Sequence, residues 1–335
     1  MPSFKPSRKS TIYDVAARAG VSYQTVSRVI NNNPNVSSKT RSRIMRIIEE
    51  LDYRPNRAAQ VLNTQRSHTL EVIALDLFTG TPAIDTLSST ARSLGYTMMI
   101  SVITAEDLAK TMNEAFGRSV DGFIFILSTS NIASADLATL TREIPFVRII
   151  AEYGTDIPSV VFDQAYGTRL VVQHLLGLGH RQIAEISGSL DTLDASLRHD
   201  SFIAVLAENG LSPTASVCGH FSVESGYTAC LDLLASQQPF TAIVAANDSM
   251  AIGALHALRE KGLRVPQDMS VVGFDDSTYA AYTYPPLTTV RQDFAVMALL
   301  ATEYLVALIE KPDTPIYQQV LMPELIVRQS TRQIG

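Results

Sequence analysis

The 335-residue sequence predicts a small all-α head followed by an α/β body of two doubly wound parallel-sheet lobes. Apolar residues recur at helical spacing within residues 11–53. From residue 70 onward, short apolar runs alternate with amphipathic helical stretches, which is the pattern of parallel βαβ units. Hydrophobic residues form 46% of the chain and charged residues 18%, so the composition favours large packed cores over disorder.

Charge is distributed unevenly between the two parts. Residues 1–66 contain twelve lysines and arginines and only four acids, a net charge of +8. Because the whole chain carries −6, the remaining residues carry −14. A basic head on an acidic body indicates that the head alone contacts a polyanion.

The head begins with two short helices joined by a turn. Thr11 is placed to cap the first helix, and Gly20 ends it and permits a tight turn. The second helix follows Ser22, and its apolar residues at helical spacing are expected to face inward: Val26, Val29 and Ile30. A helix, a short turn containing glycine and a second helix are the sequence form of a helix-turn-helix.

A third helix and a linker complete the head region. The segment "NNNPN" breaks the second helix, and Ser37 or Ser38 begins the third. Tyr13 in the first helix is expected to pack. We place the head at residues 1–54 and a linker at 55–69, where "NRAAQVL" is long enough for only about two helical turns and is unstable alone. A plain linker is the alternative for this segment.

The outward face of the second helix predicts DNA binding. With its apolar residues in the core, Tyr23, Gln24, Thr25, Ser27 and Arg28 must face out. Glutamine pairs with adenine edges, arginine pairs with guanine, and hydroxyl groups suit phosphates. The first residues of a recognition helix reach the bases, so Tyr23 and Gln24 are the first candidates. A merely solvated helix face is the alternative, which the local positive charge and the turn disfavour.

The body, residues 70–335, predicts a ligand site at the ends of its strands. Ligands of open parallel sheets bind beyond the carboxyl ends of the strands. Polar residues follow the apolar strand candidates at those ends: Ser128, Asp163, Asn247, Asp275 and Asp276.

No motif predicts catalysis, a metal or a cofactor. The segment "GLGHRQ" lacks the third glycine of a dinucleotide fingerprint, and no phosphate-loop or His-Glu-x-x-His motif occurs. The six histidines show no metal-ligand spacing, and "GFDD" alone is weak evidence for a cation. No signal peptide or membrane span is visible, so we expect a cytoplasmic protein with reduced Cys218 and Cys230, no membrane partner and no enzymatic activity.

Long stretches of the chain resemble the lactose-repressor (LacI/GalR) family of bacterial transcription regulators. They include "TIYDVAARAGVSYQTVSRVINNNPNVSSKTRSRI", "TAIVAANDSMAIGALHALREKGLRVPQDMSVVGFDD" and "YPPLTTVRQDF". The resemblance implies a DNA-binding head, a hinge helix and a body like periplasmic sugar-binding proteins. It implies a first lobe of about 70–163 plus 292–322, and a second of about 164–291 plus 323–335.

The resemblance also implies roles for individual residues. Those implied to read bases are Tyr23, Gln24 and Arg28. Those implied to contact the DNA backbone are Thr11, Ser22, Thr25, Ser27, Asn31, Ser37 and Thr40. Those implied to form the minor-groove hinge are Asn56, Ala59 and Leu62. Those implied to bind a small effector are Asp163, Arg198, Phe221, Asn247 and Asp275.

The implied function is a repressor of sugar-utilisation genes whose affinity for a near-palindromic operator is controlled by a carbohydrate. A nucleobase-type corepressor is one alternative, and a sugar-binding transport protein is another, which the DNA-binding head disfavours. Because one helix-turn-helix reads one half-site, a two-fold partner is needed for the other half, and we expect a homodimer.

Overall fold

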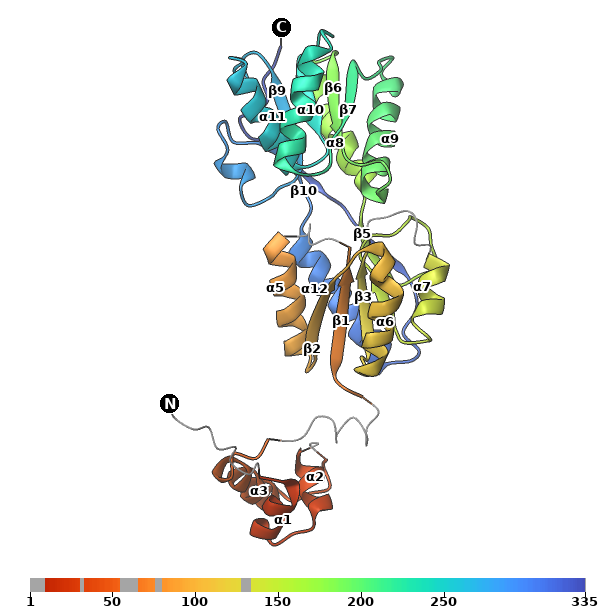
Figure 1. The fold of residues 1–335 in the computed structure, drawn as a ribbon, viewed down its shortest axis with the longest axis vertical. Coiled ribbons are helices and arrows are strands. Elements are labelled where there is room, and N and C mark those ends of the chain that lie inside the picture. The colour runs from red at the N-terminus through yellow and green to blue at the C-terminus, as the bar shows by residue number, and fades with distance from the viewer. Residues whose placement is uncertain (1–9, 31–32, 55–65, 76–79, 128–133, 335) are drawn as a thin grey trace. The chain divides into compact units, whose positions relative to one another are not determined.

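The computed structural model describes residues 10–30, 33–54, 66–75, 80–127 and 134–334. The chain divides into two compact units, Met1–Ser67 and His68–Gly335 (Figure 1). None of the helices in the described ranges is long and apolar enough to cross a membrane.

The head unit is a bundle of α1 (Ile12–Ala19), α2 (Tyr23–Ile30) and α3 (Ser38–Glu50). A capping box begins α1, in which Thr11 N–H donates to Asp14 and Asp14 N–H donates to the Thr11 hydroxyl. Gly20 ends α1 in the left-handed conformation, with φ +63°. The helices enclose a small apolar core of Val15, Ala16, Ala19, Val26, Val29, Ile44 and Ile47.

The first lobe of the body is a parallel sheet covered on both faces. Its strands lie in the order β11-β5-β4-β3-β1-β2. Their bounds are β1 (Thr69–Ala74), β2 (Thr97–Val102), β3 (Gly122–Ile126), β4 (Phe146–Arg148), β5 (Ser159–Phe162) and β11 (Gln318–Leu321). Helices α5 (Gly80–Ser93) and α12 (Phe294–Glu310) cover one face, and α6 (Leu108–Gly117) and α7 (Ser134–Leu140) cover the other.

The second lobe repeats this plan, with the strand order β12-β10-β9-β8-β6-β7. Its strands are β6 (Ile183–Ser187), β7 (Ala215–Cys218), β8 (Ala242–Ala245), β9 (Ser270–Asp275), β10 (Thr288–Arg291) and β12 (Glu324–Ile326). Only β12 runs antiparallel to its neighbour among the described strand pairs. Helices α10 (Val223–Ala235) and α11 (Asp248–Glu260) cover one face, and α8 (Gln164–Gly177) and α9 (Leu193–Glu208) cover the other.

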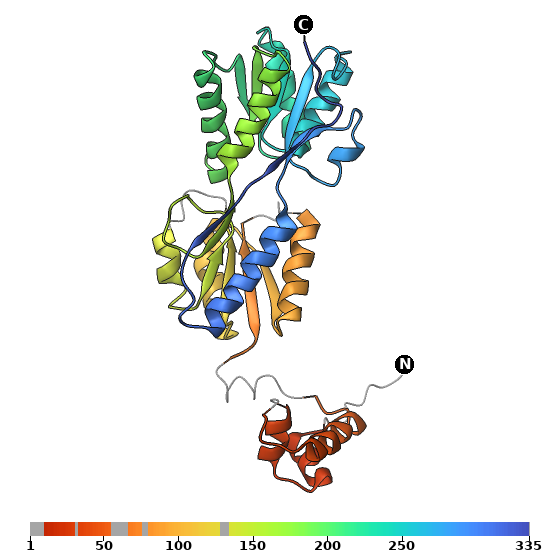
Figure 2. The same cartoon turned by 180° about the vertical axis from the view of Figure 1, so that it is seen from behind.

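Within the described residues, the chain passes between the two sheets at three places. It passes from β5 to α8, from β10 to α12, and from β11 to β12. Figure 2 shows these connections from behind, with the β11–β12 segment in dark blue. The carboxyl ends of both sheets' central strands therefore meet where the lobes join. The all-α head and the two-sheet α/β body are as the sequence predicts.

Helices α10 and α11 approach closely because two glycines face each other there. A Cβ atom on Gly253 would lie 2.1 Å from the carbonyl oxygen of Val223 and 2.5 Å from the backbone nitrogen of Tyr227. A Cβ atom on Gly226 would lie 2.3 Å from the Cα atom of Met250. These obstacles are backbone atoms, so a side chain can be accommodated only if the helices separate.

We therefore expect Gly253→Ala to lower the free energy of unfolding by about 1–3 kcal/mol through overpacking. For a lobe of this size, that is a drop of about 2–4 °C in melting temperature per kcal/mol. Gly117→Ala is the matched control, because nothing lies within 4 Å of a Cβ atom at that helical position. Thermal unfolding of the full chain compares the two variants, and equal melting temperatures would contradict the close helix contact.

Candidate functional site

The outer face of α2 presents the side chains expected to read DNA. Tyr23, Gln24 and Arg28 are exposed, while Thr25 and Ser27 are half-buried. Tyr13, which is expected to pack, lies on the surface of the head beside Tyr23. Its side chain is 65% exposed, and its ring lies 5.5 Å from that of Tyr23. Tyr13 of α1 and Tyr23 of α2 therefore lie together on the surface, because aliphatic residues fill the small core of the head.

The hydroxyl residues of the head sit at the first turns of the helices. The Ser22 hydroxyl accepts from the backbone N–H of Thr25, and the Ser37 hydroxyl accepts from that of Thr40. Ser37, rather than Ser38, is the N-cap of α3. Helix N-termini with exposed hydroxyls are suited to bind phosphates. Several residues singled out from the sequence lie outside the described residues: Asn31, Asn56, Ala59, Leu62 and Ser128.

A cavity of about 330 Å³ lies between the two lobes of the body. Its first-lobe wall is mostly apolar and is formed by Leu75, Ile149, Ile150, Ala151, Val161, Phe162, Phe294 and Met297. Its second-lobe wall is mostly polar and includes Gln164, Ser189, Asp191, Thr192, Asp194, Arg198, His220, Phe221, Asn247 and Asp275. Gln292, in the β10–α12 connection, also lines it. The cavity brings together four of the five residues expected to bind an effector.

Arg198 is the central cation of this cavity. It lies in the second turn of α9 and is only 7% exposed. Its Nε donates to Gln164 Oε1 at 2.9 Å, and its Nη1 donates to the carbonyl oxygen of Ala246. Its Nη2 lies 3.7 Å from Asp275 Oδ1, and its guanidinium stacks 3.9 Å from the ring centroid of Phe274. A buried guanidinium needs such partners, because burial without them is very unfavourable.

Two buried glutamines close a ring of polar contacts with Arg198. Gln164 Nε2 donates to Gln292 Oε1 at 2.9 Å, and Gln292 Nε2 donates to Asp275 Oδ1 at 2.8 Å. The ring therefore runs from Arg198 through both glutamines to Asp275 and back. Burial raises the pKa of Asp275 to about 6, although Arg198 and the bond from Gln292 oppose the rise.

Asp194 adds a second carboxylate to the cavity. It lies in the first turn of α9, four residues before Arg198. Burial raises its pKa, while the charges of Arg198 and Arg148 act in the opposite direction. Asp194, Gln164 and Gln292 are not among the residues singled out from the sequence, and Asp194 could not be found by its position after a strand because it lies in a helix. Gln164 and Gln292 do follow strands by two and one residues, which was an available signal.

Asn247 acts on the cavity mainly by positioning Phe221. Its Oδ1 accepts from Met250 N–H and so caps α11, and its Nδ2 donates to the carbonyl oxygen of Phe221 at 3.0 Å. Phe221 has a left-handed backbone, φ +61°, which this bond helps to hold. The Phe221 ring fills space beside Gly188, where a Cβ atom would lie 2.3 Å from it.

Asp163 is the one expected effector residue that does not line the cavity. Its Oδ1 accepts from Tyr166 N–H at 2.8 Å, so the carboxylate is the N-cap of α8. Asp163 directly follows β5, as the strand pattern predicts, but its side chain is hydrogen-bonded to the N-terminus of α8.

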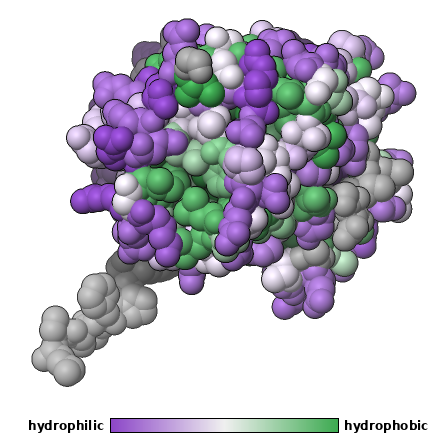
Figure 3. All heavy atoms as spheres, turned by 90° about the horizontal axis from the view of Figure 1, so that it is seen from above, coloured by the Kyte–Doolittle hydropathy of each residue, from purple (hydrophilic) through white to green (hydrophobic). Residues whose placement is uncertain are grey.

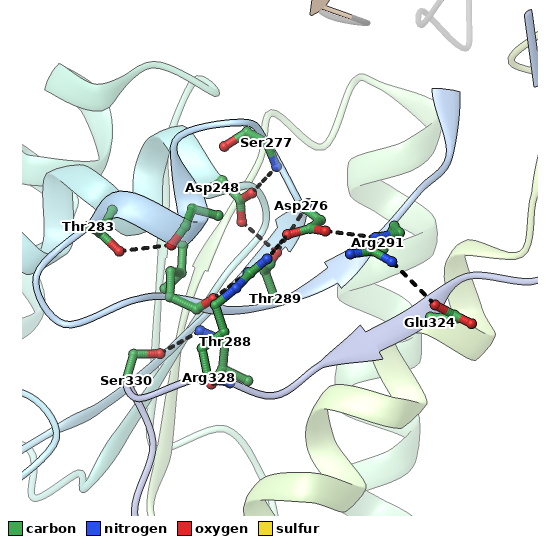
Figure 4. Close-up of polar contacts among 12 residues, drawn as sticks. Asp248, Asp276, Ser277, Thr283, Thr288, Thr289, Arg291, Glu324, Arg328 and Ser330 are labelled. Carbon is green, nitrogen blue, oxygen red and sulfur yellow. Dashed lines mark hydrogen bonds and ion pairs between the residues drawn. The ribbon is translucent and has the colours of Figure 1, made fainter. Parts of the chain in front are cut away.

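A second network fixes the turn that follows β9 (Figure 4). The Asp276 carboxylate accepts from Arg328 and, at 2.8 Å, from Arg291 Nε. Asp248 Oδ1 accepts from the Thr289 hydroxyl, and its Oδ2 accepts from Ser277 N–H at 2.6 Å. Burial, with a smaller contribution from the nearby Asp275 charge, raises the pKa of Asp248 to about 7. Asp276 thus serves the turn and not the cavity.

Known protein families match both the head and the body of the chain. Residues 11–56 match the family of bacterial regulatory proteins called lacI, and residues 172–331 match a periplasmic binding protein-like domain. The lactose operon repressor of Escherichia coli (strain K12) is 34% identical over 326 residues, covering 96% of this chain and 90% of that protein. The chain belongs to the lacI family.

Other relatives and structures of the lacI family show how closely the chain follows it. The regulator DegA of Bacillus subtilis (strain 168) is 37% identical, covering 96% of this chain and 98% of that protein. The HTH-type transcriptional repressor PurR of Haemophilus influenzae (strain PittEE) is 33% identical, covering 97% of this chain and 99% of that protein. The structure of the Lac repressor dimer bound to operator and the anti-inducer ONPF matches with a TM-score of 0.90 at 34% identity, covering 97% of this chain and all of that one.

The lacI membership confirms the fold class predicted from the sequence. The chain is a DNA-binding transcriptional regulator, and its named relatives are regulators and not enzymes. The described residues contain no group of three or more His, Cys, Asp or Glu side chains that could hold a metal.

The raised pKa of the buried Asp248 predicts that the free energy of unfolding of this lacI-family chain depends on pH. The folded pKa of Asp248, about 7, lies above the ordinary value of 3.8. Between these values the folded chain holds a proton that the unfolded chain has lost, so the free energy of unfolding falls as pH rises through this window. An asparagine has no proton to lose and can accept from Ser277 and donate to Thr289.

We therefore expect Asp248→Asn to gain stability relative to the wild type between about pH 5 and about pH 8. Urea unfolding at the two pH values measures the change, with the exposed Asp313→Asn as the control. A constant difference between variant and wild type at both pH values would show that Asp248 does not titrate in this range.

Proposed function

We propose that this lacI-family chain is a repressor that binds a near-palindromic operator as a homodimer and releases or tightens it when a small carbohydrate binds between the lobes. The observation that carries the proposal is the polar ring of Arg198, Gln164, Gln292 and Asp275 beside a cavity bounded by both lobes. We assign the head to residues 1–54, the hinge and linker to 55–69, and the effector-binding body to 70–335.

DNA reading is assigned to the exposed start of α2. Tyr23 and Gln24 are its first two residues, and Arg28 follows about one and a half turns later. Thr11, Ser22, Thr25, Ser27, Asn31, Ser37 and Thr40 are assigned to phosphates, and Asn56, Ala59 and Leu62 to the minor groove. The structure of the similar Lac repressor dimer was obtained with operator bound. A regulator of this kind acts in the cytoplasm, on chromosomal DNA.

The dimer is supported by exposed hydrophobic surface as well as by the need for two half-sites. Tyr279, Tyr282 and Tyr284 follow β9 and are 72%, 87% and 94% exposed. Tyrosine is enriched in protein–protein interfaces. Figure 3 shows one face of the molecule, on which hydrophobic side chains gather in a patch framed by hydrophilic ones. Such patches commonly mark contact surfaces.

The chemistry of the second-lobe wall fits a polyol. A guanidinium and a carboxylate placed together can donate to and accept from adjacent hydroxyl groups of one sugar. Phe221 offers an aromatic face to a sugar ring, and Asn247 holds it in place. A nucleobase-type corepressor is the second candidate, because a flat heterocycle can also stack on the Phe221 ring and pair with the polar groups of this wall. A transport protein is disfavoured by the helix-turn-helix head.

The head assignment predicts a loss of sequence recognition in Gln24→Ala. A bidentate base contact contributes about 1–3 kcal/mol, so affinity for operator selected from random duplexes should fall about tenfold to a hundredfold. Affinity for unrelated DNA, and its slope with salt concentration, should stay unchanged because no phosphate contact is removed. Fluorescence anisotropy at several salt concentrations measures both. An equal loss on both DNAs would place Gln24 on the backbone.

The cavity assignment predicts a separation of functions in Asp275→Asn. Loss of a charge-assisted bond of about 1.5–3 kcal/mol should lower effector affinity about tenfold to a hundredfold while operator binding survives. Asp163→Asn is the matched control, because asparagine also caps helices and residue 163 does not line the cavity. Calorimetry with a sugar found by thermal-shift screening tests the pair. Equal losses in both variants would return Asp163 to the site.

A further inference from the structure

The cavity between the lobes carries more negative than positive charge. Among the described residues that line it are three carboxylates, Asp191, Asp194 and Asp275, and one guanidinium, Arg198. The imidazole of His220 also lines it, with Nδ1 2.9 Å from the Ser189 hydroxyl. A site built for a phosphate or carboxylate normally gathers cations and free N–H groups instead.

The N–H groups of Arg198 that remain for a ligand lie beside a carboxylate. The Nε and Nη1 atoms of Arg198 donate to Gln164 and Ala246, and its Nη2 faces Asp275. Its planar face is covered by the Phe274 ring. An anionic ligand that accepts from Nη2 would therefore stand next to the half-buried Asp275 carboxylate, which already faces this nitrogen.

None of the described residues that line the first-lobe wall is a cation, and Arg148 of β4 attracts Asp194 only from behind the lining. The described lining residues of this wall are apolar apart from Tyr153, whose hydroxyl already donates to Phe162 and accepts from Gln164 N–H. Arg148 is fully buried behind this wall and lies 3.2 Å from Glu152.

Asp194 is the carboxylate whose charge is least compensated by neighbouring contacts. Asp275 receives a hydrogen bond from Gln292 and faces Arg198, whereas Asp194 is reached by Arg198 and Arg148 only through longer-range attraction. Burial raises the pKa of Asp194, while the charges of Arg198 and Arg148 favour its carboxylate form, so a second negative charge beside it adds to the cost of keeping that carboxylate.

We propose that the cavity selects uncharged sugars over their phosphorylated and carboxylated forms, and that Asp194 sets this selection. The proposal rests on the carbohydrate effector assigned above. An anionic group near Asp194 faces like charge, or forces the carboxyl group to take up a proton. An uncharged hydroxyl group meets neither penalty.

The test uses the full chain and matched probes. Glucose, galactose and ribose are compared with glucose 6-phosphate, galactose 6-phosphate, ribose 5-phosphate, glucuronate and galacturonate by thermal shift and then by calorimetry. The bound sugar should exceed its charged counterparts in affinity by at least about tenfold, the factor that about 1.4 kcal/mol of like-charge repulsion produces. Asp194→Asn should reduce this ratio several-fold.

The control is Asp200→Asn, which removes the same charge from an exposed position of the same helix. Asp200→Asn should leave the ratio of the two affinities unchanged. The effect of Asp194→Asn then cannot be explained by a loss of stability or of net charge alone. A charged sugar that binds more tightly than its parent would overturn the selection. A ratio equally changed in both variants would overturn the role of Asp194. If purines raise the melting temperature and no sugar does, the assignment of a carbohydrate effector is wrong. Operator binding is measured separately, so the repressor assignment is tested independently of the effector.

Discussion

The closed ring of Arg198, Gln164, Gln292 and Asp275 is the interaction on which the body of this protein depends. Gln164 begins α8 just after the first connection between the lobes, and Gln292 lies within the second. The two amides are 5% and 4% exposed, so each must keep its partners. The ring therefore fixes both connections relative to the cavity wall. Any ligand that contacts Arg198 or Asp275 therefore acts directly on polar contacts at these two connections.

The third connection, from β11 to β12, is linked to the turn after β9 through ion pairs of Asp276. Asp275 and Asp276 have left-handed backbones, with φ +109° and +52°, and such non-glycine residues persist only where their surroundings hold them. The Asp276 carboxylate supplies this hold by pairing with Arg291, at the end of β10, and with Arg328, beyond β12. Arg291 also lies 3.7 Å from Glu324, which begins β12. Asp275 is thus adjacent in sequence to Asp276, whose ion pairs tie together two of the connections between the lobes. A ligand that contacts Asp275 could therefore affect how the lobes are arranged, as a conformational switch requires.

The structure was easiest to predict from the sequence where a short local pattern has a single physical explanation, such as a helix cap or a buried apolar strand. The head helices follow from Thr11, Gly20 and Ser37, whose capping roles are local, and central strands such as β3 are buried apolar runs. Helix α12 was not anticipated, because it buries side chains around most of its circumference and shows little periodicity. Edge strands β7 and β11 are hard to recognise in the sequence because each has only four residues, most of them partly exposed. Asp163 shows the limit for sites: a carboxylate after a strand looks the same whether it caps a helix or faces a ligand.

The two walls of the cavity have opposite chemistry, and this bears on how binding drives a response. The polar second-lobe wall supplies directional bonds, so it fixes where and in which orientation a ligand sits. The apolar first-lobe wall, with Ile149, Ile150 and Phe294, gains free energy only by being removed from water, which has no preferred direction. How far the lobes close is then set by the size and shape of the ligand's outward face. One fold can in this way serve ligands that tighten operator binding and ligands that weaken it, because both hold the same polar ring but leave different lobe angles.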